Sequence, residues 1–543
     1  MTNQNQSNLQ TDKQLTSRAL IIGALGSMLL TASSMYVALR MGALPWPTVF
    51  AAIASMSVLR LLGNTTLNEI NVAQTGMTAG AMISGGLAFT LPGLWTSGDL
   101  DLSSIFIKIF YVAIAGLILG IVLTWYWRPM LLEREKLPFP IGIATAETIK
   151  AGDAGGKKAW LLAGSLGITA IFTLIRDWFG KIPQMLVFKS LAPFNIQAGL
   201  MLWPMAPAIG YMIGGLYTVV LMVGALIAFF VIIPVGVAVG LFADVATAEA
   251  FKNTLGLGLM VGSGLGVLCQ FLWKRLKQVK QPTAMADLLQ AKYSNKGFNK
   301  RLVMILMLAA AASCVGAGMS VLTSILTLAG AFLMTLMACL ITGQTGIDPM
   351  EIFGIIVMMG ITFLVRSDWQ TNLLIAAVVA VASGFAGDTM FDYKTGQIIG
   401  TDPKAQLISQ AVGGLVGVVV ASLTIFVIIA QFGPVFEADL PAPQAAMVFS
   451  MVNQAFDPVV VWSGAIIGIV LVLLKIPSTT LGIGMYLPFG FSFAIFIGGM
   501  LNYLVKKLWP KQIEQGMVVA SGVFGGESLT GVAIAFLSFF QSI

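Results

Sequence analysis

Three aspartates and two lysines interrupt an otherwise apolar part of the chain, between positions 386 and 410. Asp388 and Asp392 are one helical turn apart, and Lys394 follows two positions later. Ionisable groups at membrane depth cost about 2.5 to 3.5 kcal/mol each on insertion scales, so they usually mark solute or ion pathways. Two carboxylates on one helical face repel each other in a low dielectric, which favours a proton on one of them. The pair therefore predicts a proton-coupling site.

The alternative for this stretch is an ion-paired loop at the cytoplasmic surface, in which Lys394 neutralises one of the acids. Inside the membrane, Lys394 would instead bind a substrate carboxylate. Glu527 lies in an apolar segment with no base beside it in the sequence, so it is expected to be protonated or to face a cavity. Glu147 is either a proton-coupling counterpart in the first half of the chain or the ion-pair partner of Lys150.

A run of amides and hydroxyls precedes a glycine-rich apolar segment near position 76. Amide side chains both donate and accept hydrogen bonds, which suits recognition of a polar solute. The alternative is a solvated loop that caps the next helix. The triplet Gln-Thr-Gly in this run recurs at 344–346. The substrate-binding candidates from the two copies are Glu69, Asn71, Gln74, Thr75, Gln344 and Thr345.

Two acids follow the second Gln-Thr-Gly triplet. Asp348 and Glu351 are three residues apart and would share a helical face, and Pro349 suits a first helical turn. Asp348 is therefore either a helix N-cap or, with Glu351, a substrate contact. Tyr486, at a proline-containing interruption, and Ser521, in a glycine-rich segment, complete the predicted substrate-binding set.

The composition identifies the class of protein. Hydrophobic residues make up 57% of the 543 residues and charged residues 10%, and mean hydropathy is +0.90. Soluble domains carry about 25% charged residues. We predict an all-α polytopic membrane protein of about 16 transmembrane helices, within a range of about 14 to 18. Clusters of Pro and Gly predict interrupted or re-entrant helices at 137–142, 202–207, 343–349 and 486–490.

The charge distribution suggests how the chain is divided. Residues 1–17 are polar and are expected to form a disordered cytoplasmic tail. Residues 274–301 are strongly basic, so the positive-inside rule places this loop in the cytoplasm. The two apolar regions, 18–273 and 302–543, share short motifs in the same order. They are predicted to be pseudo-symmetric parallel repeats of about eight helices each.

Several kinds of chemistry are disfavoured by the residues present. The chain contains no His, and Cys269, Cys314 and Cys339 are single residues in apolar runs, so we expect no metal site and no cofactor. No ATP-binding or nucleic-acid-binding motif is apparent, and a proton gradient is the expected driving force. A passive channel or facilitator for polar solutes is the alternative function. An intramembrane aspartyl enzyme is a weaker one, and we expect no enzymatic activity.

Five motifs carry a family resemblance: FPIGIATAETIKAGD, GQTGIDPMEIFG, the segment SGFAGDTMFDYKTGQIIGTDPKAQLISQAVGGLVG, GIGMYLPFGFSFAIFIGG and VVASGVFGGESLTGVA. Over nearly the whole chain, from about Thr16, the sequence resembles the oligopeptide transporter (OPT) family, specifically prokaryotic members near its yellow stripe-like branch. The resemblance implies secondary, proton-coupled symport into the cell of small peptides, glutathione-like compounds or metal chelates. It also implies a multi-pass protein of a prokaryotic inner membrane, with a homodimer as one assembly known among relatives.

Overall fold

A computed structural model describes residues 14–41, 48–97, 102–154, 156–278, 299–432, 435–436, 440, 442–453 and 457–542. Most of the predicted disordered tail, at 1–13, lies outside the described residues, as does most of the predicted cytoplasmic loop, at 279–298. Side chains near the end of the first half, including that of Cys269, are outside them as well.

The all-α prediction is confirmed. The helices of the first half are α1 (Ser17–Met41), α2 (Thr48–Leu61), α3 (Leu67–Ala88), α4 (Leu102–Arg128), α5 (Pro140–Ala154), α6 (Gly156–Thr173), α7 (Met205–Ile213), α8 (Gly215–Leu226), α9 (Ile233–Ala238) and α10 (Val245–Gln278). π-Helical turns extend three of them: η3 (Pro129–Arg134), η4 (Leu174–Trp178) and η6 (Ile227–Ile232). Short 3₁₀ turns occur at η2 (Pro92–Ser97) and η5 (Lys189–Phe194).

The second half is also helical. Its elements are α12 (Lys300–Gly316), α13 (Val321–Thr345), α14 (Met350–Leu364), α15 (Trp369–Ile399), α16 (Pro403–Phe432), α17 (Pro443–Asn453), α18 (Pro458–Leu473), α19 (Ser478–Tyr486), α20 (Phe489–Leu508), the 3₁₀ turn η7 (Pro510–Gln512) and α21 (Ile513–Ser542). The β-structure of the described residues is one short antiparallel hairpin. It pairs β1 (Met185–Val187) with β2 (Gly199–Met201), and Met185 lies opposite Met201.

Within the described residues, eight helices are long and apolar enough to cross a membrane. Other predicted segments are divided into shorter pieces, such as the nine-residue helices α7 and α19. The chain is thus a polytopic membrane protein with interrupted helices, while the figure of about 16 spans stays a prediction.

Proline and glycine account for these interruptions. All four predicted Pro/Gly clusters coincide with helix boundaries: α5 begins at Pro140, α7 follows Pro204, α13 ends before Gly346, and α20 follows Pro488. Gly346 adopts a left-handed conformation (φ 74°), which costs glycine little because it has no Cβ. The breaks at Pro140 and Gly346 lie in buried parts of the protein, whereas Pro204 is half-buried and Pro488 is exposed.

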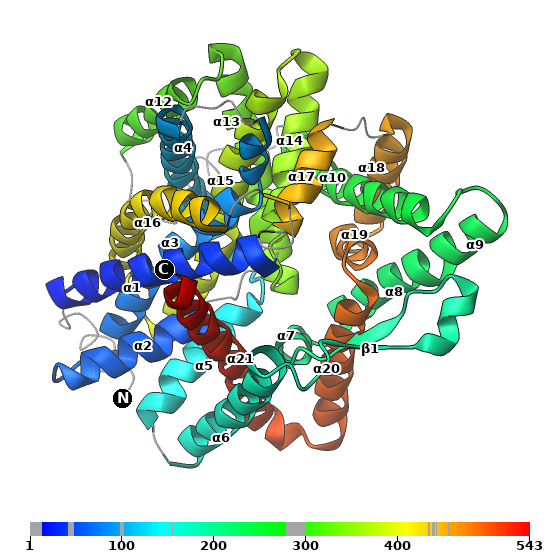
Figure 1. The fold of residues 1–543 in the computed structure, drawn as a ribbon. Helices are drawn as coiled ribbons and strands as arrows, with labels where there is room; N and C mark the ends of the chain where they lie inside the picture. Colours follow the sequence, from blue (N-terminus) through cyan, green and yellow to red (C-terminus); the bar gives the residue numbers. More distant parts are fainter. Residues whose placement is uncertain are drawn as a thin grey trace.

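The helices form two groups, and each group draws on both halves of the sequence (Figure 1). The first group contains α1–α4 and α12–α17, and the second contains α7–α10 and α18–α20. Helices α5 and α21 contact members of both groups, and α6 packs against α5 and α21. The sequence halves are thus interlocked rather than side by side. The predicted parallel repeat stays a prediction.

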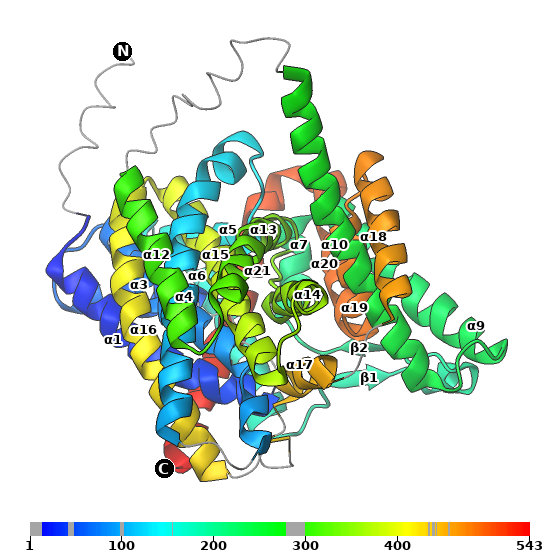
Figure 2. The same ribbon diagram turned by 90° about the horizontal axis from the view of Figure 1, so that it is seen from above.

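Helix α15 is the centre of the first group. Its apolar window is entirely buried, whereas the windows of the other candidate spans are between 22% and 56% buried. It packs against α3, α4, α5, α13, α14 and α16, which surround it in the second view (Figure 2). A polar side chain on α15 therefore meets other protein groups rather than lipid.

Close packing of α3 on α16 depends on glycine. A Cβ at Gly413 would overlap the carbonyl oxygen of Gly76, and one at Gly417 would overlap Gly80. Small residues at such crossings let two backbones approach closely in a membrane. The contact brings the polar side chains of α3 and α16 within reach of α15.

Candidate functional site

Helix α15 carries the two predicted coupling acids. The side chain of Asp368 caps the helix N-terminus by accepting a hydrogen bond from the backbone N–H of Thr371 (3.2 Å). The pKa of Asp368, which lies at the helix end, is lowered: burial opposes its ionisation, but hydrogen bonds from the Thr371 hydroxyl and backbone outweigh this effect. Further along the helix, Asp388 and Asp392 are 6% and 3% exposed. The interpretation of the pair as a surface loop is therefore wrong, because both acids lie in a buried helix.

Asp392 is held by hydrogen-bond donors from α3. Gln74 Nε2 donates to Asp392 Oδ1 at 2.5 Å, and Thr78 Oγ1 donates to Asp392 Oδ2 at 2.9 Å. Gln406 Nε2, on α16, donates to the main-chain oxygen of Asp392 at 2.7 Å. The structure thus joins Gln74 and Asp392, which the sequence had assigned to different roles. Thr78 and Gln406 were missed, although Gln406 lies in the polar 386–410 stretch.

The same three helices continue the polar contacts along α3. Asn71 Nδ2 donates to Thr401 Oγ1 at 3.0 Å, and Gln406 Nε2 also reaches Thr75 Oγ1 at 3.3 Å. The amide oxygens of Asn71, Gln74 and Gln406 are buried and make no hydrogen bond in the described structure. Three of the predicted α3 residues therefore form one network with Asp392. The prediction of a solvated loop here is wrong, because α3 is a buried helix.

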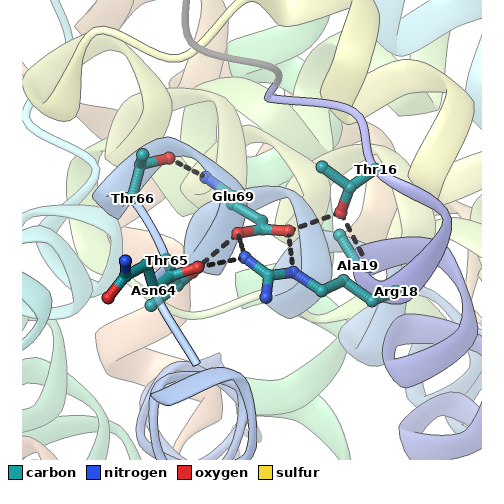
Figure 3. Close-up of polar contacts among 7 residues, drawn as sticks. All are labelled: Thr16, Arg18, Ala19, Asn64, Thr65, Thr66 and Glu69. Carbon is teal, nitrogen blue, oxygen red and sulfur yellow. Dashed lines mark hydrogen bonds and ion pairs between the residues drawn. The ribbon is translucent and has the colours of Figure 1, made fainter. Parts of the chain in front are cut away.

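Glu69 lies in the first turn of α3. Its side chain belongs to a polar cluster with the N-terminal segment (Figure 3). Arg18 donates from Nε and Nη2 to the two Glu69 carboxylate oxygens, each at 2.6 Å. Thr16 and Thr65 donate as well, at 2.5 and 2.8 Å. The Glu69 carboxylate is thus occupied by protein donors in this conformation, and its predicted substrate contact is untested.

A second set of acids lies where α13 gives way to α14. Asp348 is not the N-cap of α14: Pro349 holds that position, and no side chain caps the helix there. Both Asp348 carboxylate oxygens are instead buried and have no hydrogen-bond partner among the described residues. Asp388 Oδ1 shares this condition. Glu351, in the first turn of α14, is 6% exposed and close enough to Asp348 to repel its charge.

The other predicted substrate contacts occupy several places. Thr345 Oγ1 accepts from the N–H of Ile347 at 3.1 Å and so supports the turn after α13, where Gln344 is half-buried. Tyr486, at the end of α19, is close enough to Glu351 to sense its charge. Lys394 Nζ donates to Gln397 Oε1 at 3.2 Å, away from both coupling acids. Ser521 is fully buried and donates within its own helix, to Met517 O.

Glu527 does have a basic partner, which the sequence did not reveal. Arg176 Nη2 lies 2.7 Å from Glu527 Oε1, and the backbone N–H of Met205 donates to Glu527 Oε2 at 2.6 Å. Arg176 also pairs with Asp177 at 2.6 Å. The expectation of an isolated acid was wrong, because Arg176 arrives from η4, over 300 positions away. The adjacent Arg-Asp pair inside an apolar segment was the available signal.

Glu147 lies half-buried on α5, together with Lys150. Among the described residues no ion pair joins the two, so the Glu147–Lys150 alternative is not seen in this conformation. Its proton-coupling role stays a prediction.

Lys252 is a further buried charge that the sequence did not single out. Its Nζ donates to Met485 O at 3.1 Å and to Asn253 Oδ1 at 2.8 Å, and it lies 4.6 Å from the centroid of the Phe229 ring. The carbonyl belongs to the last turn of α19, where the helix leaves such groups without an intrahelical partner. Lys252 therefore stabilises the break between α19 and α20.

Within the described ranges, no three His, Cys, Asp or Glu side chains are grouped so that they could hold a metal ion. The carboxylates at the α13–α14 turn and on α15 lie in a bundle of membrane-spanning helices. A buried polar interior in such a bundle is typical of membrane proteins that move solutes or ions.

Comparison with known proteins identifies the family. The model of the family described as "OPT oligopeptide transporter protein" matches residues 14–538, and the chain belongs to this family. A relative from Haemophilus influenzae, named "Putative oligopeptide transporter", is 22% identical over 93% of this chain and 92% of its own length. The resemblance stated from the motifs is confirmed, and the protein is a membrane transporter.

Proposed function

We propose that this transporter imports small peptides or peptide-like solutes, such as glutathione-like compounds or metal chelates, by proton-coupled secondary transport. The observation that carries the proposal is the set of buried carboxylates on α13–α15, of which Asp348 and Asp388 have oxygens without hydrogen-bond partners. Ionising a carboxyl group in such a place is costly unless the charge is paired, so an unpaired group there favours its protonated form. The name of the relative supports a peptide substrate.

Carboxylates are the proton carriers that this chain offers. It contains no His, so a proton path through the protein must use acids, lysine, hydroxyls or water. Asp388 and Asp392 are the proposed coupling acids on α15. Glu527 has a weaker case, because its ion pair with Arg176 stabilises the ionised form.

Alternating access would require movement between helix groups. The two groups meet through α5 and α21, and directly where α13 and α14 contact α7, α8, α10 and α19; several helices break near this junction. Broken helices expose backbone groups and helix ends that serve as solute ligands in other transporters. The proposed substrate contacts are those near breaks, namely Gln344, Thr345 and Tyr486, with Lys394, Ser521 and the α3 amides as further candidates.

A proteoliposome experiment tests the coupling. The purified protein would be reconstituted with an acidic outside and a neutral inside, and uptake of labelled di- to tetrapeptides, glutathione and metal chelates would be measured. We expect accumulation above the outside concentration, abolished by a protonophore. Flux that only equalises the two concentrations with or without the pH step would instead indicate a channel or facilitator. Peptide cleavage without accumulation would indicate an enzyme.

Orientation and assembly form a separate part of the proposal. We place the protein in a prokaryotic inner membrane with the N-terminus and the 274–301 loop in the cytoplasm, on the basis of the basic residues in that loop. A homodimer is the proposed assembly. Cysteine labelling from outside intact cells, at positions introduced in the 274–301 loop, tests the orientation, because a cytoplasmic loop should resist an impermeant reagent.

A further inference from the structure

The turn between α13 and α14 brings an acid against the centre of α15. After α13 ends, the left-handed Gly346 redirects the chain, and the Thr345 hydroxyl accepts the N–H of Ile347. The Asp348 carboxylate then lies directly against Gly387, because a Cβ at that glycine would overlap Asp348 Oδ2. Asp388 is the next residue of α15. The structure thus brings together two acids that are 40 positions apart in the sequence.

Three carboxylate oxygens of these two acids are buried and make no hydrogen bonds within the described structure. They comprise both carboxylate oxygens of Asp348 and Oδ1 of Asp388. A third side chain shares the place: Thr342 Oγ1 is fully buried, also lacks a partner, and would lie 2.7 Å from a Cβ at Gly387. Buried polar atoms are rarely left unpaired in proteins. Unpaired oxygens of Asp348 and Thr342 thus lie against Gly387, and the next residue of α15, Asp388, carries another unpaired oxygen.

The charged groups that act on Asp348 and Asp388 are other acids. From α14, Glu351 faces Asp348; on α15 itself, Asp392 lies close enough to Asp388 to repel it. From α13, Cys339 is buried near both acids.

From α4, Arg128 approaches the Tyr393 ring at 5.8 Å rather than either acid. From α5 come Glu147 and Lys150, both half-buried. The titratable residues of α3 and α16, Glu69 and Lys404, lie near helix ends, and α17 has none.

Asp392 is in a different situation from this pair. Each of its carboxylate oxygens accepts a hydrogen bond, one from Gln74 and one from Thr78. Hydrogen bonds to a carboxylate favour its charged form, and an anion at Asp392, one turn away, would favour a proton on Asp388.

We propose that Asp348 and Asp388 form the coupling site of this transporter and hold one proton between them, with Thr342 Oγ1 as a third oxygen ligand. The proton, taken up from water outside the cell, bridges the two carboxylates in the conformation described. When the turn after α13 moves away from α15, the proton passes to water on the cytoplasmic side. Asp392, named above with Asp388 as a coupling acid, is in this assignment the hydrogen-bonded anion beside the pair and not a proton carrier. This inference rests on the proposed proton coupling and assigns it to particular atoms.

Transport assays on single variants test the assignment. Asp348→Asn and Asp388→Asn would be compared with the wild type for pH-driven accumulation and for counterflow, the exchange of labelled for unlabelled solute at equal pH. One proton moved down a one-unit pH step can sustain about a tenfold accumulation. We expect both variants to lose this accumulation while counterflow remains and no longer depends on pH.

A glycine pair provides a steric test with a matched control. Gly387→Ala would displace the Asp348 carboxylate and is expected to abolish accumulation. Gly384→Ala, one turn earlier on the same helix, would meet the flexible end of Met350, with its sulfur 2.7 Å away. This control disturbs the same α14–α15 contact without touching an acid and should keep accumulation near the wild-type value.

A chemical probe on the wild-type protein gives a test that does not depend on folding of the variants. Dicyclohexylcarbodiimide modifies protonated carboxyl groups within membranes, and mass spectrometry locates the modified residue. We expect modification at Asp348 or Asp388, decreasing as the pH rises.

Three results would overturn the assignment: accumulation retained by both Asn variants, modification only at Asp392 or Glu351, or accumulation that follows a sodium gradient instead of the pH step. A wild-type protein that never accumulates solute under a pH step would instead refute the proposed proton coupling itself, and the assignment with it.

Discussion

The guanidinium of Arg176 meets the carboxylate of Glu527 at 2.7 Å, and both side chains are less than 5% exposed. Arg176 Nη1 also donates to Leu202 O at 2.6 Å, just before α7. The Arg176 side chain therefore connects the end of α6 to α21 through an ion pair, and to the segment before α7 through a hydrogen bond. Breaking a buried pair by removing one partner costs roughly 3 to 5 kcal/mol, because the other charge is left unpaired.

The two partners are not equivalent, which gives the first prediction. Arg176→Met leaves two acids without their base, Glu527 and Asp177, whereas Glu527→Gln leaves Arg176 paired with Asp177. We expect Arg176→Met to lower the apparent melting temperature of the purified protein clearly more than Glu527→Gln does. The double variant should recover part of the Arg176→Met loss. Equal losses from both single variants would contradict the contacts described.

The second prediction concerns the Asp392 hydrogen bonds. A hydrogen bond to a charged group contributes about 1.5 to 3 kcal/mol. Thr78→Val removes one such donor from Asp392 and is expected to destabilise the folded protein by about that amount. Ser84→Ala is the control on the same helix, because the buried Ser84 hydroxyl bonds only within α3. Thermal unfolding in detergent should separate the two, and matching melting temperatures would count against the Asp392 contact.

Close packing of α3 on α16 gives the third prediction. Gly413→Ala would force a methyl group into the backbone of Gly76. Overpacking of this kind costs about 1 to 3 kcal/mol. Gly164→Ala, on α6, is the control, since a Cβ there meets nothing within 4 Å. Yield of monodisperse protein and its melting temperature measure the difference, and a Gly413→Ala protein as stable as the control would argue against this crossing.

The fourth prediction is a pH dependence at the start of α15. The folded-state pKa of Asp368 lies below its ordinary value, so its stabilising contribution is complete above about pH 4 and is lost as the pH falls through the folded pKa. Asp368→Asn retains a capping side chain but does not titrate. The melting-temperature difference between wild type and variant should therefore shrink as the pH falls from about 4 through the folded-state pKa of Asp368. A difference that does not change with pH would contradict a stabilising contribution from the ionised Asp368 carboxylate.

Hydropathy and Pro/Gly clusters predicted the all-α class, the membrane environment and four helix breaks, because these depend on local composition. Contacts between residues far apart in the sequence do not depend on local composition, so they could not be predicted in this way. The partner of Glu527 is apparent only in the fold, which places η4 beside α21. Likewise, the contact of Asp348 with Gly387 depends on a turn whose direction a sequence does not show.

Identical triplets illustrate the same limit. Gln74-Thr75-Gly76 lies within α3, where Gln74 binds Asp392 and Gly76 meets α16. Gln344-Thr345-Gly346 ends α13, where Gly346 turns the chain. The same residue types thus serve a helix crossing in one place and a helix end in the other. Burial and partners, rather than the letters, decide which.

The dependence of α3 on distant helices has a consequence for biosynthesis. Its buried amides reach partners on α15 and in the turn between α15 and α16, more than 300 residues later in the chain. The ribosome completes α3 long before those partners are synthesised. The new helix must therefore remain beside the translocon, a chaperone or earlier helices while its polar side chains lack their hydrogen-bond partners. Premature release of the chain before α16 should therefore leave a fragment that quality-control proteases recognise.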